Sequence, residues 1–348
     1  MSGARNHLLV HLAPDKHSFY RDAPAIFWSD QLSCWITADP ATMQTIQKDS
    51  AFRVLDQSAE IDRIKARLRI DLPNIARVLR SVPVNVEGDE HTERRRRMAR
   101  VIAARTEAAL ARFSGLAREL CGRHLAREGR CELVADLFEP LSMALAQALS
   151  GVSLAHDPGS PTPAQIFDRS LGLNRRKLID AELRRLWQVA CRNVSESEAD
   201  EAIALAVLGS DTVFASLALS FAERVSSNPR ARLGDIEWGD HLTASAVPFI
   251  ERTASRTTEL AGATIREGDL VRLFLDSYSL EPPDKRDGYF GTGRHACLGR
   301  PIAQRAWSAL ASVLRELPLF VRIDSVRYRA ADAMFLFPSQ IAVSVHEH

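Results

Sequence analysis

One cysteine lies in a setting that constrains the fold of the whole chain. In the stretch Phe290-Gly-Thr-Gly-Arg-His-Ala-Cys297-Leu-Gly299, Cys297 stands among three glycines and beside a histidine and an arginine. Leu298 to Leu317 then has helical apolar spacing, which predicts a helix that begins just after Cys297. Unpaired N–H groups and the helix dipole at such a start favour negative charge and lower the pKa of a thiol. The stretch therefore predicts a metal-binding thiolate, which we interpret as a ligand of haem iron.

The glycines around Cys297 support this interpretation, because they let the backbone turn and pass close to a flat macrocycle without Cβ clashes. The alternative for a lone cysteine is a buried small hydrophobic residue, and we expect that role for the other four cysteines, Cys34, Cys121, Cys131 and Cys191. The order Phe-Gly-x-Gly-x-His-x-Cys-x-Gly resembles the haem-binding loop of the cytochrome P450 family. The resemblance implies that Phe290, Gly291, His295 and Gly299 contact haem b and that Cys297 ligates its iron.

The composition is that of an ordinary globular chain. Its 348 residues are 46% hydrophobic and 26% charged, with a formal net charge of +1. The near-neutral balance gives no reason to expect nucleic-acid binding. The first residues, Met-Ser-Gly-Ala-Arg-Asn-His, lack the apolar region of a signal peptide, and five dispersed cysteines form no disulfide framework. We therefore expect a cytoplasmic protein.

The apolar segment from Ala202 to Ala222 is long enough to span a membrane. Asp211 lies in its middle, and a charge at the bilayer centre is costly. We therefore predict a helix buried inside a soluble protein, and no membrane association. Ser195-Glu196-Ser197-Glu198 is a capping box at its start, and Asn228-Pro229 ends it.

Periodicity along the rest of the chain predicts a mainly α fold with small β-sheets, which we place in one domain, 1–348. The β-rich portion is expected at about 22–38 and 247–275, with a hairpin at 25–37 and further short strands from Val321, and the helical portion at about 39–229 and 298–317. Cys131 to Leu137 is expected to be a strand or an extended link. The predicted helices cover roughly 40–50, 56–68, 73–81, 88–112, 113–128, 137–151, 163–171 and 177–193.

A polar island, Gly209-Ser210-Asp211-Thr212, interrupts the buried helix. A buried acid and hydroxyl are costly unless they are hydrogen-bonded, and a glycine within a helix opens a notch in its wall. In a haem enzyme such a notch would face the iron, dioxygen would bind there, and Asp211 and Thr212 would relay protons. The alternative is structural, with Thr212 bonded back to the Leu208 carbonyl and Asp211 paired with a basic residue.

The resemblance to cytochromes P450 extends to three further stretches. Leu208 to Val213 looks like the dioxygen-activating helix of the camphor-hydroxylating type, with Asp211 and Thr212 at its acid–alcohol pair and Gly209 beside the cofactor. Glu90-His-Thr-Glu-Arg-Arg-Arg is similar to the family's His-x-x-x-Arg helix, which assigns a haem propionate to His91 and Arg95, although four consecutive arginines leave the register open by one residue. Pro248-Phe-Ile-Glu-Arg252 resembles the strand whose arginine binds a propionate.

The chain also departs from the family pattern. The family carries a Glu-x-x-Arg helix upstream of the strand with Arg252, but here Trp238-Gly-Asp-His-Leu-Thr243 stands in that place. A literal Glu182-x-x-Arg185 precedes the apolar helix and cannot be the same element. The segment from Asp269 to Phe290 is short, so the meander with its partner arginine is expected to be largely absent, and the cover between Val152 and Gly209 is short too. We expect weaker haem retention and an open substrate pocket.

These patterns predict a haem-thiolate monooxygenase that inserts one oxygen atom of O2 into an apolar small molecule, in secondary metabolism. The resemblance implies electrons from NAD(P)H through a ferredoxin and its reductase. One alternative is a divergent haem protein that does peroxygenase, dehydratase, isomerase or coupling chemistry. Another is a haem-binding protein without catalytic activity.

Overall fold

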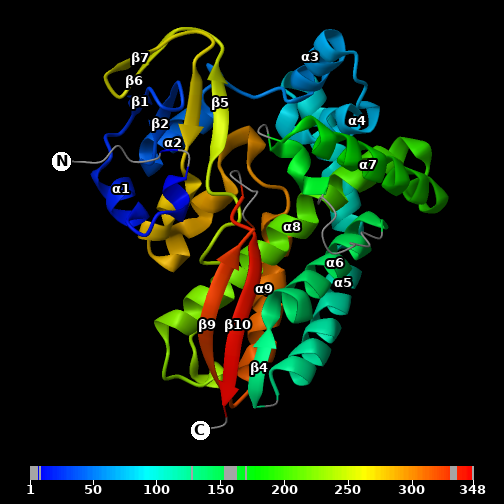
Figure 1. Cartoon of the computed structure of the whole chain (residues 1–348), viewed down its shortest axis with the longest axis vertical. Helices are drawn as coiled ribbons and strands as arrows, with labels where there is room; N and C mark the ends of the chain where they lie inside the picture. The colour runs from blue at the N-terminus through cyan, green and yellow to red at the C-terminus, as the bar shows by residue number, and fades with distance from the viewer. Residues whose placement is uncertain are drawn as a thin grey trace.

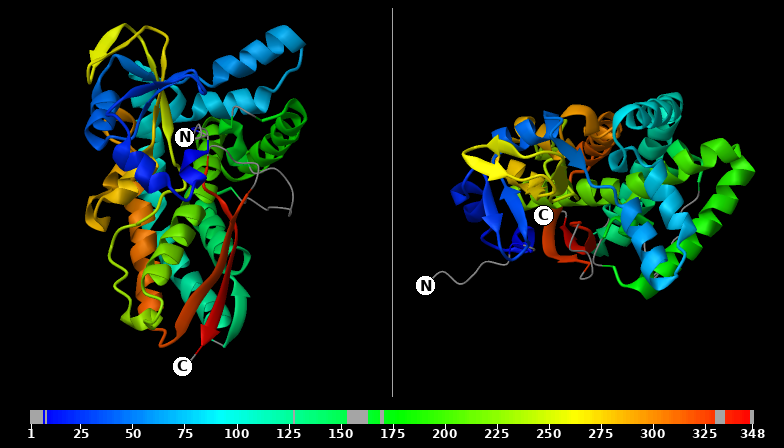
Figure 2. Two further views of the ribbon diagram at one scale, coloured as in Figure 1. Left: turned by 60° about the vertical axis from the view of Figure 1, so that its left-hand side comes forward. Right: turned by 90° about the horizontal axis from the view of Figure 1, so that it is seen from above.

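The architecture described below is that of a computed structural model of the chain. It describes residues 7, 9–126, 128–152, 163–168, 171–329 and 335–346. A β-rich part with the N-terminal elements lies beside a helical part, and a three-stranded sheet with the C-terminal strands lies at the opposite end (Figures 1 and 2). The predicted mainly α class with small sheets is confirmed.

The central element is α8 (Glu196–Ser227), a 32-residue helix that crosses the molecule obliquely (Figure 1). It begins at the predicted capping box, in which Ser195 and Glu198 satisfy each other's backbone donors. The helix is long and apolar enough to cross a membrane by length and composition alone. It packs against α4 (Pro73–Ser81), α6 (Glu139–Ser150) and α7 (Leu173–Asn193), which is the arrangement of a buried core helix.

The prediction of two helices at 88–112 and 113–128 is wrong, because a single 37-residue helix, α5 (Gly88–His124), covers this region. Gly115 does not interrupt it. Phe113, Ala117 and Leu120 lie on its buried face, and the helix packs against α6 and α9 (Arg300–Arg315). Burial of this apolar face outweighs the roughly 1 kcal/mol that a glycine costs within a helix.

The other helices follow the predictions closely. They are α2 (Pro40–Lys48), α3 (Ser58–Leu68), α4, α6, α7 and α9, with α1 (Lys16–Asp22) as an unpredicted addition. The predicted helix at 163–171 is a 3-10 helix, Pro163–Phe167, and residues 169 and 170 lie outside the described residues. The predicted strand or link from Cys131 to Leu137 is partly wrong, since β4 (Gly129–Glu132) is followed by a π-helix, Val134–Phe138.

The described strands form three sheets. The first has the order β1-β2-β8-β5-β3, built from β1 (Phe27–Ser29), β2 (Cys34–Thr37), β8 (Leu270–Leu273), β5 (Ile250–Ala254) and β3 (Phe52–Val54). The predicted hairpin is the β1–β2 pair, whereas the parallel pairing of β2 with β8 joins distant segments. The second sheet, β4-β10-β9, contains β9 (Phe320–Tyr328) and β10 (Pro338–His346), which are longer than the short strands predicted. The third pairs β6 (Thr258–Leu260) with β7 (Ala263–Ile265).

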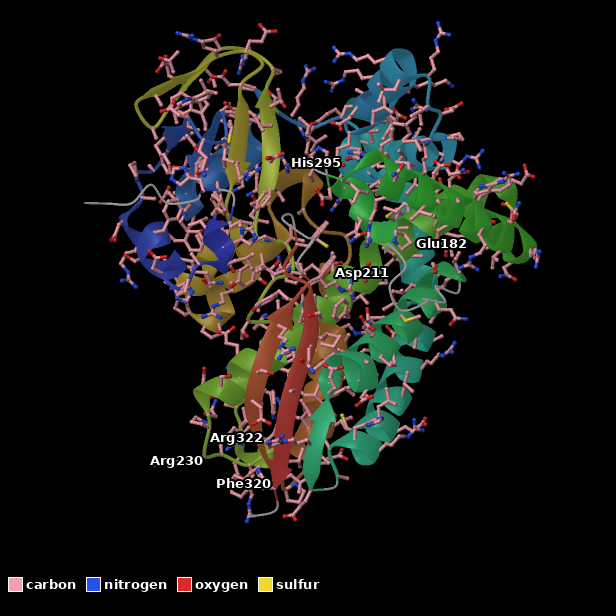
Figure 3. The ribbon with its side chains drawn as sticks, viewed as in Figure 1. Glu182, Asp211, Arg230, His295, Phe320 and Arg322 are labelled. Carbon is pink, nitrogen blue, oxygen red and sulfur yellow. The ribbon has the colours of Figure 1, made fainter. Side chains whose placement is uncertain are left out.

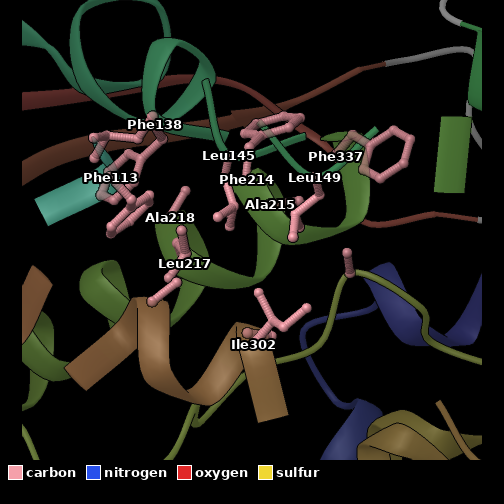
Figure 4. Packing of buried hydrophobic residues seen from close by; sticks show 14 of the residues in the cluster. Phe113, Phe138, Leu145, Leu149, Phe214, Ala215, Leu217, Ala218, Ile302 and Phe337 are labelled. Carbon is pink, nitrogen blue, oxygen red and sulfur yellow. The ribbon is translucent and has the colours of Figure 1, made fainter. Parts of the chain in front are cut away.

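The main hydrophobic core surrounds α8, with side chains from α5, α6 and α9 and the C-terminal Phe337 (Figure 4). The segment 229–249, where the resemblance leads one to expect a Glu-x-x-Arg helix, has no α-helix and one 3-10 turn, Leu233–Asp235. Trp238 anchors it instead. Its ring stacks on Phe221 with centroids 5.6 Å apart, and its Nε1 donates to the Leu233 carbonyl at 2.9 Å. Apolar burial therefore holds this segment where a helix is missing.

His11, in the N-terminal 3-10 helix Val10–Leu12, is almost fully buried and lies 5.9 Å from the Phe249 ring. Neither ring nitrogen has a hydrogen-bond partner among the described residues. Burial lowers the pKa of His11 to about 4; nearby Lys16 and Arg272 act in the same direction, while Asp276 opposes them. The folded protein thus holds a neutral imidazole there.

This burial predicts acid sensitivity. Below the ordinary histidine pKa of 6.5 the unfolded chain takes up a proton that the folded chain refuses until about pH 4. The free energy of unfolding should therefore fall between these values, by up to about 3 kcal/mol from this group alone. Urea titrations at several pH values give the slope of the free energy of unfolding against pH. His11→Phe should flatten this slope, and His17→Phe, at an exposed position, should leave it unchanged. Equal slopes for wild type and His11→Phe would contradict the assignment.

Candidate functional site

The loop that carries Cys297 follows the 3-10 helix η7 (Pro283–Phe290) and is fixed by its main chain. The Cys297 N–H donates to the Phe290 carbonyl at 2.8 Å, which closes the loop. Gly293 has φ +71°, and a Cβ there would lie 2.7 Å from the Gln47 carbonyl oxygen at the end of α2. The Thr292 N–H donates to Gln47 Oε1 at 2.7 Å. The glycine is therefore required both by its positive φ and by the close approach of α2.

The Cys297 thiol lies at the start of α9, as predicted. The N–H groups of Gly299 and Arg300, with the Arg95 guanidinium, act to lower its pKa. Desolvation by the surrounding protein is larger, however, so the pKa is raised overall, and the expectation of a lowered pKa is wrong. The residue still has an exposed side. A thiol in this setting deprotonates when a metal cation coordinates it, since coordination outweighs burial.

Two histidines lie together next to this loop. His91 in α5 and His295 in the 3-10 turn Gly293–His295 have ring centroids 4.1 Å apart. His91 Nε2 and His295 Nδ1 are buried and have no hydrogen-bond partner among the described residues. His295 Nε2 lies 3.3 Å from Glu87. Burial and the neighbouring His91 lower the pKa of His295 to about 4, while Glu87 raises it.

The four consecutive arginines of α5 differ in their partners. Arg94 pairs with Glu90 at 2.5 Å, and Arg96 and Arg97 both pair with Glu93, at 3.2 and 2.9 Å. Arg95 makes no hydrogen bond or ion pair with any residue that the structure describes. It is half-buried, and its charge acts on both Cys297 and His91. The geometry thus favours Arg95 as the arginine that faces the site.

Arg252 in β5 is a second buried cation. Its Nη1 donates to the neighbouring Glu251 carbonyl at 2.8 Å, and no carboxylate within the described part of the chain lies at ion-pair distance. Burial lowers its pKa to about 10, and Glu87 opposes that shift. A buried guanidinium without a paired acid is costly unless an anion binds it.

These groups fit the carboxylates of a haem. Arg95 and Arg252 lack carboxylate partners, and His91 and His295 keep unpaired ring nitrogens in the same region. Arg294 joins them, with its Nε 3.2 Å from Glu87. Two propionates would supply the acceptors and negative charge that this cluster lacks. Glu87 and Gln47 were missed, because no local motif signals a contact between distant elements, and Arg294 was noted in the cysteine loop but given no role.

The polar island of α8 makes the contacts of the structural alternative. Thr212 Oγ1 donates to the Leu208 carbonyl at 2.6 Å, and the buried Asp211 has Arg329 Nη1 at 3.8 Å. The Ser142 hydroxyl of α6 donates to the Ser210 carbonyl. A Cβ at Gly209 would meet no atom within 4 Å, so the helix is open there. Asp211 lies at mid-molecule, whereas Glu182 lies on α7 and pairs with Arg185 within one turn (Figure 3).

Comparison with known proteins identifies the fold. No family model matches the chain. A segment is 41% identical over 73 residues to cytochrome P450 CYP199A2 of Rhodopseudomonas palustris (17% of this chain, 18% of that protein). Another is 33% identical over 110 residues to the putative cytochrome P450 YjiB of Bacillus subtilis (28% of each). The sequence matches therefore span less than a third of these relatives.

Solved structures match over nearly the whole chain. P450BioI in complex with an acyl carrier protein ligated to hexadec-9Z-enoic acid is 17% identical, with a TM-score of 0.75, covering 98% of this chain and 100% of that one. Epothilone D-bound cytochrome P450epoK is 16% identical with a TM-score of 0.74, covering 97% and 96%. The predicted resemblance to cytochromes P450 is confirmed.

Proposed function

We propose that this chain, whose fold is that of the cytochromes P450, is a haem-thiolate monooxygenase acting on an apolar small molecule. The observation that carries the proposal is the convergence of Cys297, at the start of α9, with two arginines that lack a carboxylate partner among the described residues and two histidines that keep unpaired buried ring nitrogens. Haem b, when bound, would activate dioxygen, and a thiolate ligand favours O–O cleavage.

The residues around the cofactor would divide the work. Cys297 would supply the sulfur ligand, with Phe290, Gly291 and Gly299 forming the loop around it. Arg95 and Arg252, with His91 and His295, would hold the two propionates. Gly209 would leave space for dioxygen. Electrons would come from NAD(P)H through a ferredoxin and its reductase in the cytoplasm, and the substrate would belong to secondary metabolism.

Asp211 and Thr212 would hold and pass on protons at the open side of α8. The Thr212 hydroxyl now donates to Leu208, so it would have to rotate about χ1 to serve a ligand, and Thr has a second accessible rotamer in helices. Asp211 would take up and release the proton beside Arg329. The Nη1 of Arg329 is buried without a hydrogen-bond partner among the described residues.

A second candidate function follows from the same contacts. Thr212 is bonded to the Leu208 carbonyl and Asp211 is paired with Arg329, which are the contacts of a structural role. The geometry therefore does not require that these two residues deliver protons. A peroxide-driven haem enzyme would not need this proton relay, because it does not use dioxygen reduced with electrons from NAD(P)H. Turnover with peroxide and none with a reductase would favour this candidate.

The ligand assignment is tested by the absorption spectrum of the reduced, carbon-monoxide-bound protein. Wild type should show the strongly red-shifted Soret band of a thiolate ligand, and Cys297→Ala should lose it. Cys191→Ala, which removes a half-buried cysteine of α7, should keep the band. A Cys297→Ala protein with the wild-type spectrum would contradict the proposal.

The propionate assignment predicts a difference between adjacent arginines. Arg95→Gln removes a cation with no other partner, so haem should dissociate about ten- to a hundredfold faster, as expected for a charge-assisted hydrogen bond. Arg96→Gln breaks only an exposed pair with Glu93 and should change the rate by less than about twofold. Haem transfer to excess apomyoglobin measures both rates. Equal rates would place the cofactor away from Arg95.

The relay predicts uncoupling. Thr212→Val keeps the side-chain shape and removes the hydroxyl, so the reduced carbon-monoxide spectrum should be unchanged while the peroxide released per NAD(P)H consumed rises severalfold. Thr106→Val is the matched control, because Thr106 makes the same back-bond, to Ile102, in α5. An unaltered peroxide ratio in Thr212→Val would favour the peroxide-driven candidate.

A further inference from the structure

Arg286, eleven residues before Cys297, uses four of the five N–H donors of its guanidinium. Nε donates to the Glu281 carbonyl at 2.8 Å and Nη2 to the Ser279 carbonyl at 2.9 Å. Nη1 donates to Glu223 Oε1 at 2.7 Å and to the Thr243 carbonyl at 2.8 Å. The side chain is 10% exposed. A largely buried guanidinium with four donors in use fixes its neighbours in one geometry.

The acceptors of Arg286 come from three parts of the chain. Glu223 lies in the last turns of α8, and Thr243 lies in the 229–249 segment that has no α-helix. Ser279 and Glu281 flank the end of the 3-10 helix Leu275–Leu280. Thr243 is itself attached to α8, because its N–H donates to Ser220 Oγ at 3.0 Å. Arg286 therefore joins the middle of η7 to the core helix.

The next residue, Asp287, connects the same point to the helix after the cysteine. Its carboxylate accepts from Arg300 and, at 3.0 Å, from Gln304 Nε2, and both donors lie at the start of α9. Cys297 lies between Asp287 and Arg300 in the sequence. The two ends of the cysteine loop are thus cross-linked, and Arg286 anchors that cross-link to α8.

We propose that Arg286 is the positioning residue that holds the Cys297 loop in place, with Glu223 as its charge partner. It gives this region the anchoring that the family pattern assigns to the missing Glu-x-x-Arg helix. This role of Arg286 rests on the proposed function, because the position of the Cys297 sulfur matters only if that sulfur is a ligand. The contacts themselves do not depend on it.

Hydrogen exchange tests the anchoring without haem. In Arg286→Gln, amides of 288–299 should exchange about tenfold or more faster than in wild type, because charge-assisted bonds to the anchor are lost. Amides in the middle of α5 should be unchanged. The matched control is Arg305→Gln, which removes an exposed Arg–Glu pair between α9 and α5, with Glu107 at 2.6 Å. Unchanged exchange in 288–299, or equal acceleration in Arg305→Gln, would overturn the proposal.

The spectrum of the haem-loaded protein gives a second readout. Arg286→Lys keeps the charge with fewer donors, and Glu223→Gln removes the partner at a position 40% exposed, so both should fold. Each should convert part of the red-shifted carbon-monoxide band to the unshifted form while the haem content stays constant, with Arg286→Gln showing the largest effect. Fully red-shifted bands in all three would overturn the proposal. If wild type itself lacks the red-shifted band, the proposed function fails, and the exchange experiment still decides the anchoring.

Discussion

The proposed function depends on one constraint: the sulfur of Cys297 has to stay at the start of α9, near the positive charge of Arg95. The Cys297–Phe290 main-chain bond and the approach of Gln47 to Gly293 set the loop. Desolvation raises the pKa of the thiol despite the nearby N–H groups and Arg95. Under the proposed function, a bound metal cation would offset the cost of burying the thiolate charge.

Two long helices carry the other groups of the proposed site. α5 carries His91 and Arg95, and α8 carries the opening at Gly209 and the buried Asp211. Both helices pack against α6, and α5 also packs on α9. A shift of either helix would move a polar group relative to Cys297, so the apolar core and the geometry of the site are coupled.

The sequence predicted most of the fold where a local signal exists. The capping box at Ser195 located α8, alternation located β1 and β2, and the cysteine loop located the start of α9. The continuity of α5 was missed, because only the packing of its apolar face outweighs the cost of Gly115 within the helix. The β2–β8 pairing was missed, because it joins residues that are far apart in the sequence. In the site, motif spacing suggested Arg95, but only the partners of Arg94, Arg96 and Arg97 distinguish it. The contacts of Arg286 required the folded chain.

The missing Glu-x-x-Arg helix suggested a weakened site, yet Trp238 and the Arg286 contacts give the same region a different support. What remains decisive is the bond between sulfur and iron. X-ray absorption at the iron edge of the haem-reconstituted protein measures it directly. We predict one sulfur atom in the first coordination shell of the iron, and none in Cys297→Ala. A shell of nitrogen and oxygen alone in wild type would contradict it.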